Sequence, residues 1–284
     1  VRDQYEESPY PRWIKPGLSI KSYKTKEYFD FFNIKFNSYL CCNKSSSDIL
    51  VAGCGTGQHA LNVASKFIES NITALDLSRS SLSYAKRKAE ELNIYINFIQ
   101  GDLLDLDNID KSFDIIECVG VLHHMEKPED GLSSLVKKLK IGGMLLVGLY
   151  SELARKDIIK CRAKFILKQK SISNHQVKAI RNKIIEDSFN YQSIINSEDF
   201  FTLSEFRDLI CHVQEHRFQI PEIMSLLKIF NLEFCGFENR LLINSFKKYN
   251  GEYDIYNLSH WEEFEKKNPL IFKGMYQFWC QKLK

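Results

Sequence analysis

The sequence predicts an α/β domain in which helices cover both faces of a parallel β-sheet. Three observations lead to this fold class. Short apolar strand-like runs alternate with helix-period segments from residue 48 onward, a glycine-rich loop follows the first run, and an acidic residue ends the second. Strands that alternate with helices at this spacing form βαβ units, which require a parallel sheet. The runs are continuously apolar, as strands buried on both faces are.

The expected elements follow a short N-terminal region in a regular order. Residues 1–47 contain aromatic residues, prolines and a serine run, which indicate a loop, a helix around 26–40 and a linker. The first five strands are expected at 49–52, 72–77, 94–99, 113–121 and 144–150, with helices at 58–69, 82–92 and 132–139. Apolar residues recur at three- and four-residue spacing in the helices, and β-branched residues are frequent in the strands.

The alternation stops after residue 150 and resumes near residue 220. The region between is expected to be mostly helical, and its 155–183 segment holds ten Lys and Arg but one acid. This basic segment is either a solvated helix face or a lid over an anionic substrate or an RNA surface. A helix at 220–230 and strands at 232–237 and 275–282 complete the expected elements.

These boundaries divide the chain into four parts. They are an N-terminal arm or lid (1–47), a Rossmann-like core (48–150), a helical insertion that serves as a lid (151–219), and the end of the core with the last two strands and a second insertion at 240–273 (220–284). We expect both insertions to belong to one α/β domain, because the strand pattern continues after each of them.

Composition excludes several classes of protein. The 284 residues include 44% hydrophobic and 26% charged residues, as in ordinary globular proteins. The net charge of +3 is too small to indicate a polyanionic partner by itself. The longest apolar run spans about ten residues (141–150), whereas a membrane helix needs roughly 20.

Two features bear on cellular location. The charged segment that starts at Val1 lacks the apolar centre of a signal peptide. The eight cysteines form no C-x-x-C pair and lie mostly in apolar segments, as buried free thiols do. We therefore expect a reducing, cytoplasmic compartment.

The strongest signal for a binding site is Gly53-x-Gly55-x-Gly57 between a strand and a helix. Glycine is required where backbone approaches a ligand closely or adopts positive φ, and the start of the following helix offers free N–H groups. Asp76 ends the next strand, where a carboxylate can accept both hydroxyls of a ribose. The alternative is a tight turn with an incidental acid.

The glycine spacing also narrows the choice of nucleoside ligand. It is G-x-G-x-G and not the G-x-G-x-x-G of pyrophosphate binders, which favours a cofactor without phosphates. Asp102 ends the third strand, where its carboxylate can accept the exocyclic amine of adenine; the alternative is a turn or helix-capping residue. Ligands of such sheets bind at the carboxyl ends of the strands, and 119–124 lies at that edge.

Five segments together carry a family resemblance: ILVAGCGTG, TALDLS, QGDLLDL, FDIIECVGVLHHM and LKIGGMLLVGLY. They resemble the successive motifs of class I S-adenosylmethionine-dependent methyltransferases. The resemblance implies a seven-stranded mixed sheet with an antiparallel last strand, S-adenosyl-L-methionine as cofactor and S-adenosyl-L-homocysteine as product. The cofactor-binding residues that it implies are Ala52, Gly53, Cys54, Gly55, Gly57, Gln58, Asp76, Leu77, Asp102, Leu103, Val119 and Gly120.

The flanking segments are similar to a narrower group. YEESPYPRW, GLYSELAR, CHVQEHRFQIPEI and NPLIFKGMYQFW resemble uncharacterised bacterial methyltransferase domains that are often fused to tetratricopeptide repeats. This resemblance implies that the sequence is part of a longer chain with such repeats. One departure from the broader family is Val51, where an acid usually helps to hold the cofactor ammonium. Backbone carbonyls near Ala52 and Gly120, or the side chains of Gln58 and His59, are candidates to replace it.

Methyl transfer needs alignment of the acceptor and, for some acceptors, a base. His123 and His124 lie where substrate should meet cofactor, and a histidine is a natural base near neutral pH. The alternative is that one caps the next helix and the other packs. Tyr10 is a third catalytic candidate.

Candidate acceptor residues come from three segments. They are Tyr5, Arg12 and Trp13 from the N-terminal arm, Tyr150 and Arg155 from the start of the insertion, and His212, Glu215, His216 and Arg217 from a helix expected at 212–217. Arg12, Arg155 and Arg217 together could bind a carboxylate or phosphate by bidentate pairing. The sequence thus favours a small anionic or zwitterionic acceptor, or a peptide side chain.

Rival functions remain at this point. The basic 155–183 segment supports an RNA methyltransferase, although the balanced charge disfavours a nucleic acid partner, and a non-catalytic cofactor-binding module is the other alternative. The segment 212–216 reads H-x-x-E-H, which on a helix could bind zinc. We expect no metal, because the glycine loop already accounts for the domain's chemistry.

Overall fold

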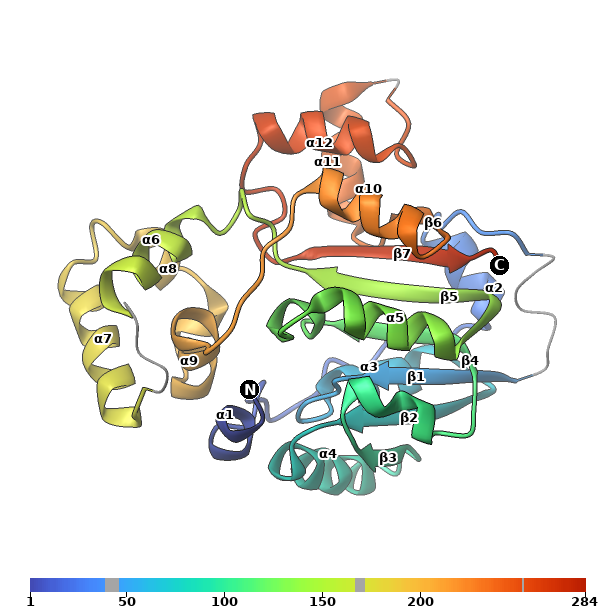
Figure 1. Cartoon of the computed structure of the whole chain (residues 1–284), viewed down its shortest axis with the longest axis horizontal. Helices are drawn as coiled ribbons and strands as arrows, with labels where there is room; N and C mark the ends of the chain where they lie inside the picture. The colour runs from blue at the N-terminus through green and yellow to red at the C-terminus, as the bar shows by residue number, and fades with distance from the viewer. Residues whose placement is uncertain (39–45, 167–171, 252) are drawn as a thin grey trace.

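Seven strands in the described part of the chain form one mixed β-sheet, in the order β3-β2-β1-β4-β5-β7-β6 (Figure 1). The computed structural model describes residues 1–38, 46–166, 172–251 and 253–284. The strands are β1 (Ser47–Ala52), β2 (Ser70–Asp76), β3 (Asn97–Gln100), β4 (Phe113–Val119), β5 (Leu139–Leu149), β6 (Leu232–Phe237) and β7 (Tyr276–Lys282). Neighbours are parallel, except that β7 is antiparallel to β5 and β6. The predicted Rossmann-like sheet with a reversed last strand is therefore confirmed.

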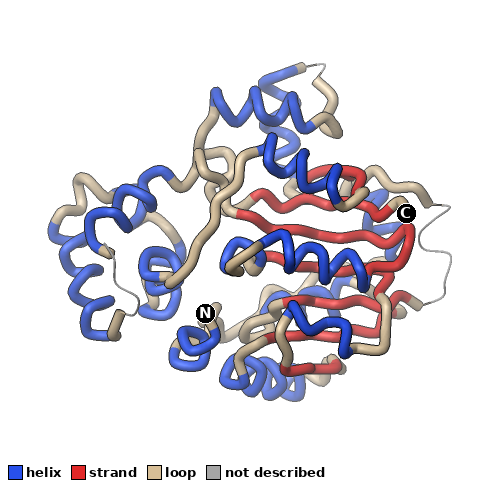
Figure 2. The backbone as a smooth tube through the Cα atoms, viewed as in Figure 1, coloured by secondary structure: helices blue, strands red, loops and turns tan. Residues whose placement is uncertain are grey.

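Helices cover both faces of this sheet (Figure 2). The α-helices are α1 (Arg2–Glu7), α2 (Thr25–Phe31), α3 (Gln58–Lys66), α4 (Arg79–Glu91), α5 (Pro128–Lys138), α6 (Lys156–Phe165), α7 (Asn174–Glu186), α8 (Gln192–Ile195), α9 (Leu203–Cys211), α10 (Ile220–Ile229), α11 (Arg240–Asn250) and α12 (Leu258–Lys267). Short 3₁₀ turns are η1 (Leu103–Asn108), η2 (Leu122–His124) and η3 (Glu198–Phe200).

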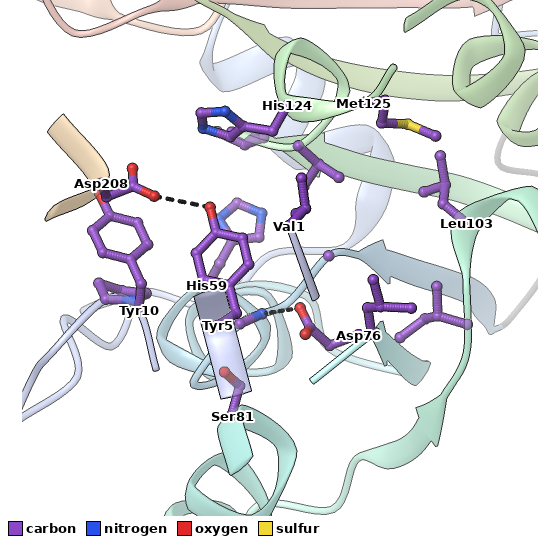
Figure 3. A pocket seen from close by; sticks show the side chains of 18 of the residues that line it. Val1, Tyr5, Tyr10, His59, Asp76, Ser81, Leu103, His124, Met125 and Asp208 are labelled. Atoms are coloured by element: carbon purple, nitrogen blue, oxygen red, sulfur yellow. Dashed lines mark hydrogen bonds between the residues drawn. The ribbon is translucent and has the colours of Figure 1, made fainter. Parts of the chain in front are cut away.

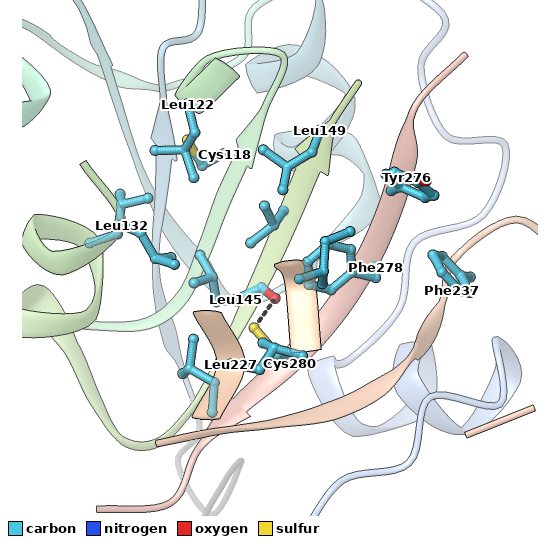
Figure 4. Close-up of a cluster of buried hydrophobic side chains, with 14 of the residues drawn as sticks. Cys118, Leu122, Leu132, Leu145, Leu149, Leu227, Phe237, Tyr276, Phe278 and Cys280 are labelled. Atoms are coloured by element: carbon cyan, nitrogen blue, oxygen red, sulfur yellow. Dashed lines mark hydrogen bonds between the residues drawn. The ribbon is translucent and has the colours of Figure 1, made fainter. Parts of the chain in front are cut away.

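Each face of the sheet has its own apolar layer. Ile115 packs in the layer under α2, α3 and α4, whereas the next residue, Ile116, packs in the layer under α5, α10, α11 and α12. Successive residues of a strand point to opposite faces, so β4 must be apolar at both positions. Figure 4 shows part of the second layer, where Leu145, Phe278 and Cys280 meet.

The insertion after β5 has a third apolar cluster of its own. Val177 of α7 and Phe206 and Ile210 of α9 are fully buried in it. Figure 1 places α6, α7 and α9 beyond the carboxyl ends of the parallel strands, to one side of the sheet. Two chain segments tie the insertion to the sheet, because Ser151 and Phe218 form a parallel bridge. The insertion therefore lies at the edge where ligands bind in this fold class.

The structure corrects several expected boundaries. β4 ends at Val119 and not at residue 121, because Gly120 turns the chain with φ of 78°. β5 starts at Leu139 and not at 144, since Gly142 and Gly143 lie inside the strand. The helix expected around 26–40 ends at Phe31, and residues 39–40 of that prediction lie outside the described residues.

The helix expected at 212–217 is wrong. α9 ends at Cys211, and His212 follows with φ −58° and ψ 134°, which is no longer helical. The segment 212–219, called the strap below, runs without regular structure to the start of α10.

The cysteines and the helix lengths can be compared with what the composition predicted. The described cysteines are buried and free: Cys54, Cys118, Cys161, Cys211, Cys235 and Cys280. Cys41 and Cys42, like part of the basic segment (167–171), lie outside the described residues. Among the described residues, every helix is too short or too polar to cross a membrane.

Candidate functional site

A cavity of about 360 Å³ lies at the carboxyl ends of β1, β2 and β4 (Figure 3). The core contributes Gly53, Gly55, Gln58, His59, Leu75, Asp76, Leu77, Ser81, Gly101, Asp102, Leu103, Val119, Gly120, Val121, His124, Met125 and Met275 to its lining. The N-terminal arm and the insertion contribute Val1, Tyr5, Tyr10, Pro11, Tyr150 and Asp208. Segments far apart in sequence therefore enclose one space at the predicted edge.

The glycine loop is shaped by close contacts that exclude side chains. A Cβ on Gly55 would lie 2.4 Å from the Tyr10 carbonyl oxygen, and one on Gly57 would lie 2.5 Å from Cβ of Ala85. Both glycines have positive φ, at 53° and 89°. These positions need glycine for space and for backbone conformation. The loop backbone can therefore pack closely against the arm and α4 while it borders the cavity.

Two acids line the cavity, Asp76 at the end of β2 and Asp102 just after β3. Asp76 accepts hydrogen bonds from the backbone N–H groups of Gly55 (2.7 Å) and Ser78 (2.9 Å), which orient its carboxylate at the cavity. Burial raises the pKa of Asp76, and these N–H groups partly offset that rise. Asp102 also lines the cavity, and its carboxylate caps η1 through the Leu104 N–H (2.9 Å). Asp102 therefore caps a helical turn, as its alternative role proposed, and it also lines the cavity.

A buried acid stands beside the position where the family's acid is missing. Glu117 of β4 pairs in register with Val51 of β1. Its carboxylate lies 2.9 Å from Lys66 Nζ and 2.8 Å from Nε2 of His59, a cavity residue. Burial alone would raise the pKa of Glu117, but Lys66 and His59 bring it down to about 2. Glu117, an acid placed directly after two β-branched residues in the run FDIIECV, is the sequence signal that could have indicated this site.

The N-terminal arm is fastened to the core on both sides of the cavity. The Glu6 carboxylate accepts from the backbone N–H groups of Arg79 and Ser80 at the start of α4, where a helix favours negative charge. The Thr56 hydroxyl donates to the Pro11 carbonyl and accepts from the indole N–H of Trp13. Trp13 is therefore a buried anchor of the arm and does not line the cavity, contrary to its predicted place among the acceptor residues.

Gln214 of the strap fixes two histidines in opposite tautomers. Its carbonyl accepts a hydrogen bond from His124 Nδ1 (2.8 Å), and its backbone N–H donates to His212 Nδ1 (3.1 Å). A neutral imidazole carries one proton, so Nε2 of His124 has the free lone pair and Nε2 of His212 carries the hydrogen. The two rings stack with centroids 3.6 Å apart. Burial lowers the pKa of His124 to about 4, so its ring is neutral at pH 7.

The ring of His123 packs inside the protein, away from the lining of the cavity. Its ring is fully buried, does not line the cavity and stacks on Tyr150 with centroids 3.8 Å apart. Both ring nitrogens are buried without a hydrogen-bond partner. The two histidines therefore differ in position: His123 packs inside the protein, and His124 faces the cavity.

Asp208 of α9 is a cavity residue that sequence reasoning missed. It is 4% exposed, and its carboxylate accepts the Tyr5 hydroxyl at 2.8 Å. Burial, partly offset by the Tyr5 hydrogen bond and the charge of Arg155, raises the pKa of Asp208 to about 6. The Tyr5 oxygen also lies 3.1 Å from Nε2 of His212, which can donate to it.

The cluster of His124, Asp208 and His212 has metal-ligand chemistry, with ligand atoms within 4.8 Å of one another. In this structure, two members of the cluster, His212 and Asp208, are already engaged in hydrogen bonds. Nε2 of His212 carries a hydrogen in the tautomer set by the strap, and the Tyr5 hydroxyl bonds to both His212 and Asp208. The predicted pair of His212 and His216 on one helix face does not form, because both lie beyond the end of α9.

Of the three arginines predicted to bind an anion, Arg155 and Arg217 lie against the protein's own Glu215, at 2.9 and 3.6 Å, and Arg12 lies apart from them. Arg155 stacks on Tyr150 (3.7 Å) and makes two hydrogen bonds to the buried Glu215 carboxylate (3.0 and 2.9 Å). Arg217 pairs with Glu152 at 2.8 Å. Arg12 is exposed and lines a separate groove with Trp13. Among the described residues, no lysine or arginine lines the cavity.

The structure thus sorts the predicted residues into two groups. Those that line the cavity are Tyr5, Tyr10, Gly53, Gly55, Gln58, Asp76, Leu77, Asp102, Leu103, Val119, Gly120, His124 and Tyr150. Those that do not are Arg12, Trp13, Ala52, Cys54, Gly57, His123, Arg155, His212, Glu215, His216 and Arg217. Several of the second group support the first: Glu215 and Arg155 hold the strap, and the His216 N–H donates to the His123 carbonyl (2.7 Å).

Comparison with known proteins agrees with this geometry. Residues 49–143 match the family model described as a methyltransferase domain. An uncharacterised protein of Synechococcus sp. is 31% identical over 202 residues, which cover 68% of this chain and 48% of that protein. A ubiquinone biosynthesis O-methyltransferase of Rickettsia bellii is 25% identical over 63% of this chain and 71% of its own length. The chain spans about half the length of the first of these relatives.

A solved structure extends the likeness to most of the chain. PKMT2 from Rickettsia typhi, which has also been solved in complex with AdoHcy, matches with a TM-score of 0.61 and 17% identity. The match covers 89% of this chain and 51% of that one. At this identity the likeness concerns the fold, and it includes the elements added to the core as well as the sheet.

Proposed function

We propose that this chain is a class I S-adenosylmethionine-dependent methyltransferase, and that it transfers the cofactor's methyl group to an acceptor bound under the arm and the insertion. The match of residues 49–143 to the methyltransferase family model supports this. The observation that carries the proposal is the shared cavity. The glycine loop, Asp76 and Asp102 line one part of it, and Tyr5 and Asp208 line another. A cofactor and an acceptor can therefore meet in one enclosed space, as in-line transfer requires.

The core side chains supply a place for each part of the cofactor. Asp76 takes the ribose hydroxyls and Asp102 the adenine amine, with the adenine ring between the leucines that line the cavity. Gln58 and His59 lie at the glycine loop and face the methionine part. Glu117 compensates for the acid missing at position 51 by orienting His59 from behind. The bound cofactor supplies an activated methyl group on sulfonium sulfur.

The arm and the insertion act as covers in this proposal. Tyr5 and Tyr10 come from the arm, Tyr150 from the start of the insertion directly after β5, and Asp208 from α9. Their position over the cavity limits the access of bulk water to the methyl group, which favours selective transfer. Tyr10 and Tyr150 shape the space for the acceptor, and the neutral Nε2 of His124 accepts a hydrogen bond from it.

The predicted anionic acceptor does not suit the observed lining, because the arginines meant to bind it pair with Glu152 and Glu215. A small molecule without strong negative charge or a peptide side chain fits the cavity better. Arg155 and Arg162 of the basic segment likewise turn inward to Glu215 and backbone carbonyls, which weakens the case for RNA. A longer chain with tetratricopeptide repeats and a cytoplasmic location stay predictions.

Calorimetry on the cofactor tests the proposal. S-adenosylmethionine should bind the wild-type chain at one site. Asp76→Ala should raise the dissociation constant of S-adenosylmethionine at least about tenfold, since the acceptor for two ribose hydroxyls is lost. Asp105→Ala, an exposed acid in the neighbouring η1 turn, is the matched control and should bind normally. Equal affinity of the Asp76 variant and wild type would contradict the assignment.

A further inference from the structure

We propose that the methyl acceptor is an amine, and that Asp208 binds its cationic nitrogen and then accepts the proton it must lose. The inference rests on the proposed function and names the substrate class of that site. It comes from the position of one buried carboxylate in relation to the cavity and to the cations around it.

Asp208 reaches the cavity from the insertion, far from the cofactor motifs in sequence. It is 4% exposed, and one of its carboxylate oxygens accepts the Tyr5 hydroxyl at 2.8 Å (Figure 3). Within the part of the chain that the structure describes, no lysine or arginine forms an ion pair with it. Its ionisable neighbour His212, 3.9 Å away, is neutral because burial lowers the pKa of that ring far below its ordinary value.

The nearby arginines belong to another carboxylate. Arg155 makes a bidentate pair with Glu215, and Arg162 lies 3.7 Å from the same group while it donates to the backbone carbonyls of Ile210 and His212. Their charges reach Asp208 through space, but burial outweighs them and raises the pKa of Asp208 to about 6. At neutral pH Asp208 is an ionised, buried carboxylate without a direct cationic partner, and such groups are normally paired.

The other lining residues indicate which class of ligand can pair with the negative charge of Asp208. Asp76 and Asp102 are acidic, the ring of His124 is neutral, and no lysine or arginine among the described residues lines the cavity. A carboxylate or phenolate acceptor would be repelled by the Asp208 carboxylate, and no lysine or arginine among the described lining residues would pair with it. An ammonium group would gain a charge-assisted hydrogen bond to Asp208, with the hydroxyls of Tyr5 and Tyr10 as polar neighbours.

The same carboxylate can complete the chemistry. An alkylammonium must lose one proton before its nitrogen can attack, and Asp208 takes that proton. The nitrogen lone pair then forms the N–C bond to the methyl carbon while the S–C bond breaks and its electron pair stays on sulfur. The products are a methylated ammonium and the neutral thioether, and Asp208 returns its proton to solvent. A carboxylate whose pKa lies near neutrality both accepts and releases a proton readily.

A matched set of small probes tests this inference: benzylamine, benzyl alcohol and benzoate. Their binding to the complex of the full chain with S-adenosylhomocysteine is measured by ligand-observed NMR at pH 7.5, and methyl transfer from S-adenosylmethionine is followed by mass spectrometry. Wild type should bind benzylamine about tenfold more tightly than the other two probes and should methylate benzylamine. Asp208→Asn should lose both properties and keep its affinity for S-adenosylhomocysteine.

Asp199→Asn is the control, because burial also raises the pKa of Asp199 to about 6 but this acid does not line the cavity. It should retain the preference for the amine. Equal or weaker binding of benzylamine, binding of none of the probes, or an Asp208 variant that keeps the preference would overturn the inference. So would an Asp208→Asn variant that loses S-adenosylhomocysteine binding, since Asp208 would then hold the cofactor. Failure of the wild-type chain to bind S-adenosylhomocysteine would instead refute the proposed function itself.

Discussion

Replacing Glu117 with Gln should destabilise the fold by about 3 kcal/mol at pH 7. The side chain is completely buried and lies 2.9 Å from Lys66 Nζ and 2.8 Å from His59 Nε2. A pKa lowered from 4.5 to about 2 corresponds to about 3 kcal/mol of stabilisation at neutral pH. Removing one member of a buried pair costs a similar amount, about 3–5 kcal/mol. Glu238, 3.8 Å from Lys66, keeps the lysine from being left without any acid.

Urea denaturation of wild type and Glu117→Gln at several pH values measures this effect. Because the pKa of Glu117 is lowered in the fold, its contribution is fully present above pH 4.5 and is lost as the pH falls toward 2. The two unfolding free energies should therefore converge in that window. Glu233→Gln, which removes an exposed pair with Lys35 at 4.0 Å, should cost less than about 1 kcal/mol. A Glu117 effect equally small, or one independent of pH, would refute the reasoning.

Three further substitutions separate packing from binding. His123→Phe should leave the unfolding free energy within about 1 kcal/mol of wild type in urea titrations, because it replaces two buried nitrogens that lack partners; a larger loss would mean that the ring has a polar role. Gly57→Ala should lower the thermal midpoint by calorimetry and weaken cofactor binding, since its Cβ would lie 2.5 Å from Ala85 and φ is positive; normal binding would contradict this account of the loop. Arg155→Met should cost about 3–5 kcal/mol in urea, because it leaves a buried carboxylate without its bidentate partner; a cost below about 1 kcal/mol would show that the pair is dispensable.

The cofactor half of the site could be predicted because its signals are local. Gly53, Gly55 and Asp76 each stand at the end of a strand that the apolar pattern marks, and parallel strands bring their carboxyl ends to one edge. The sheet followed from the same pattern, including β7, whose antiparallel direction came from the family resemblance. The ends of the strands were predicted least accurately, because a glycine can end a strand, as Gly120 does, or lie inside one, as Gly142 does.

The acceptor half could not be predicted in the same way, because no strand pattern fixes the direction of an inserted helix. α9 is amphipathic, yet Arg207 and Asp208 are both buried in its last two turns. Arg207 donates to Asn174 of α7, on the side away from the cavity. Asp208 turns to Tyr5 of the arm. Which of two adjacent polar residues faces the ligand depends on how α9 packs against α7, and this contact joins segments that sequence periodicity does not relate.

The H-x-x-E-H segment shows that the meaning of a short motif depends on the secondary structure in which it lies. Histidines four residues apart share a face only in a helix, and here the buried pair of Glu215 with Arg155 holds the chain in an irregular path. The two histidines therefore share no helix face. The atoms that act on the cavity are instead the backbone N–H and C=O of Gln214, which assign opposite tautomers to His212 and His124. Every residue except proline has these two groups. The sequence therefore gives no sign of this role, which becomes visible only when the strap is placed against the sheet.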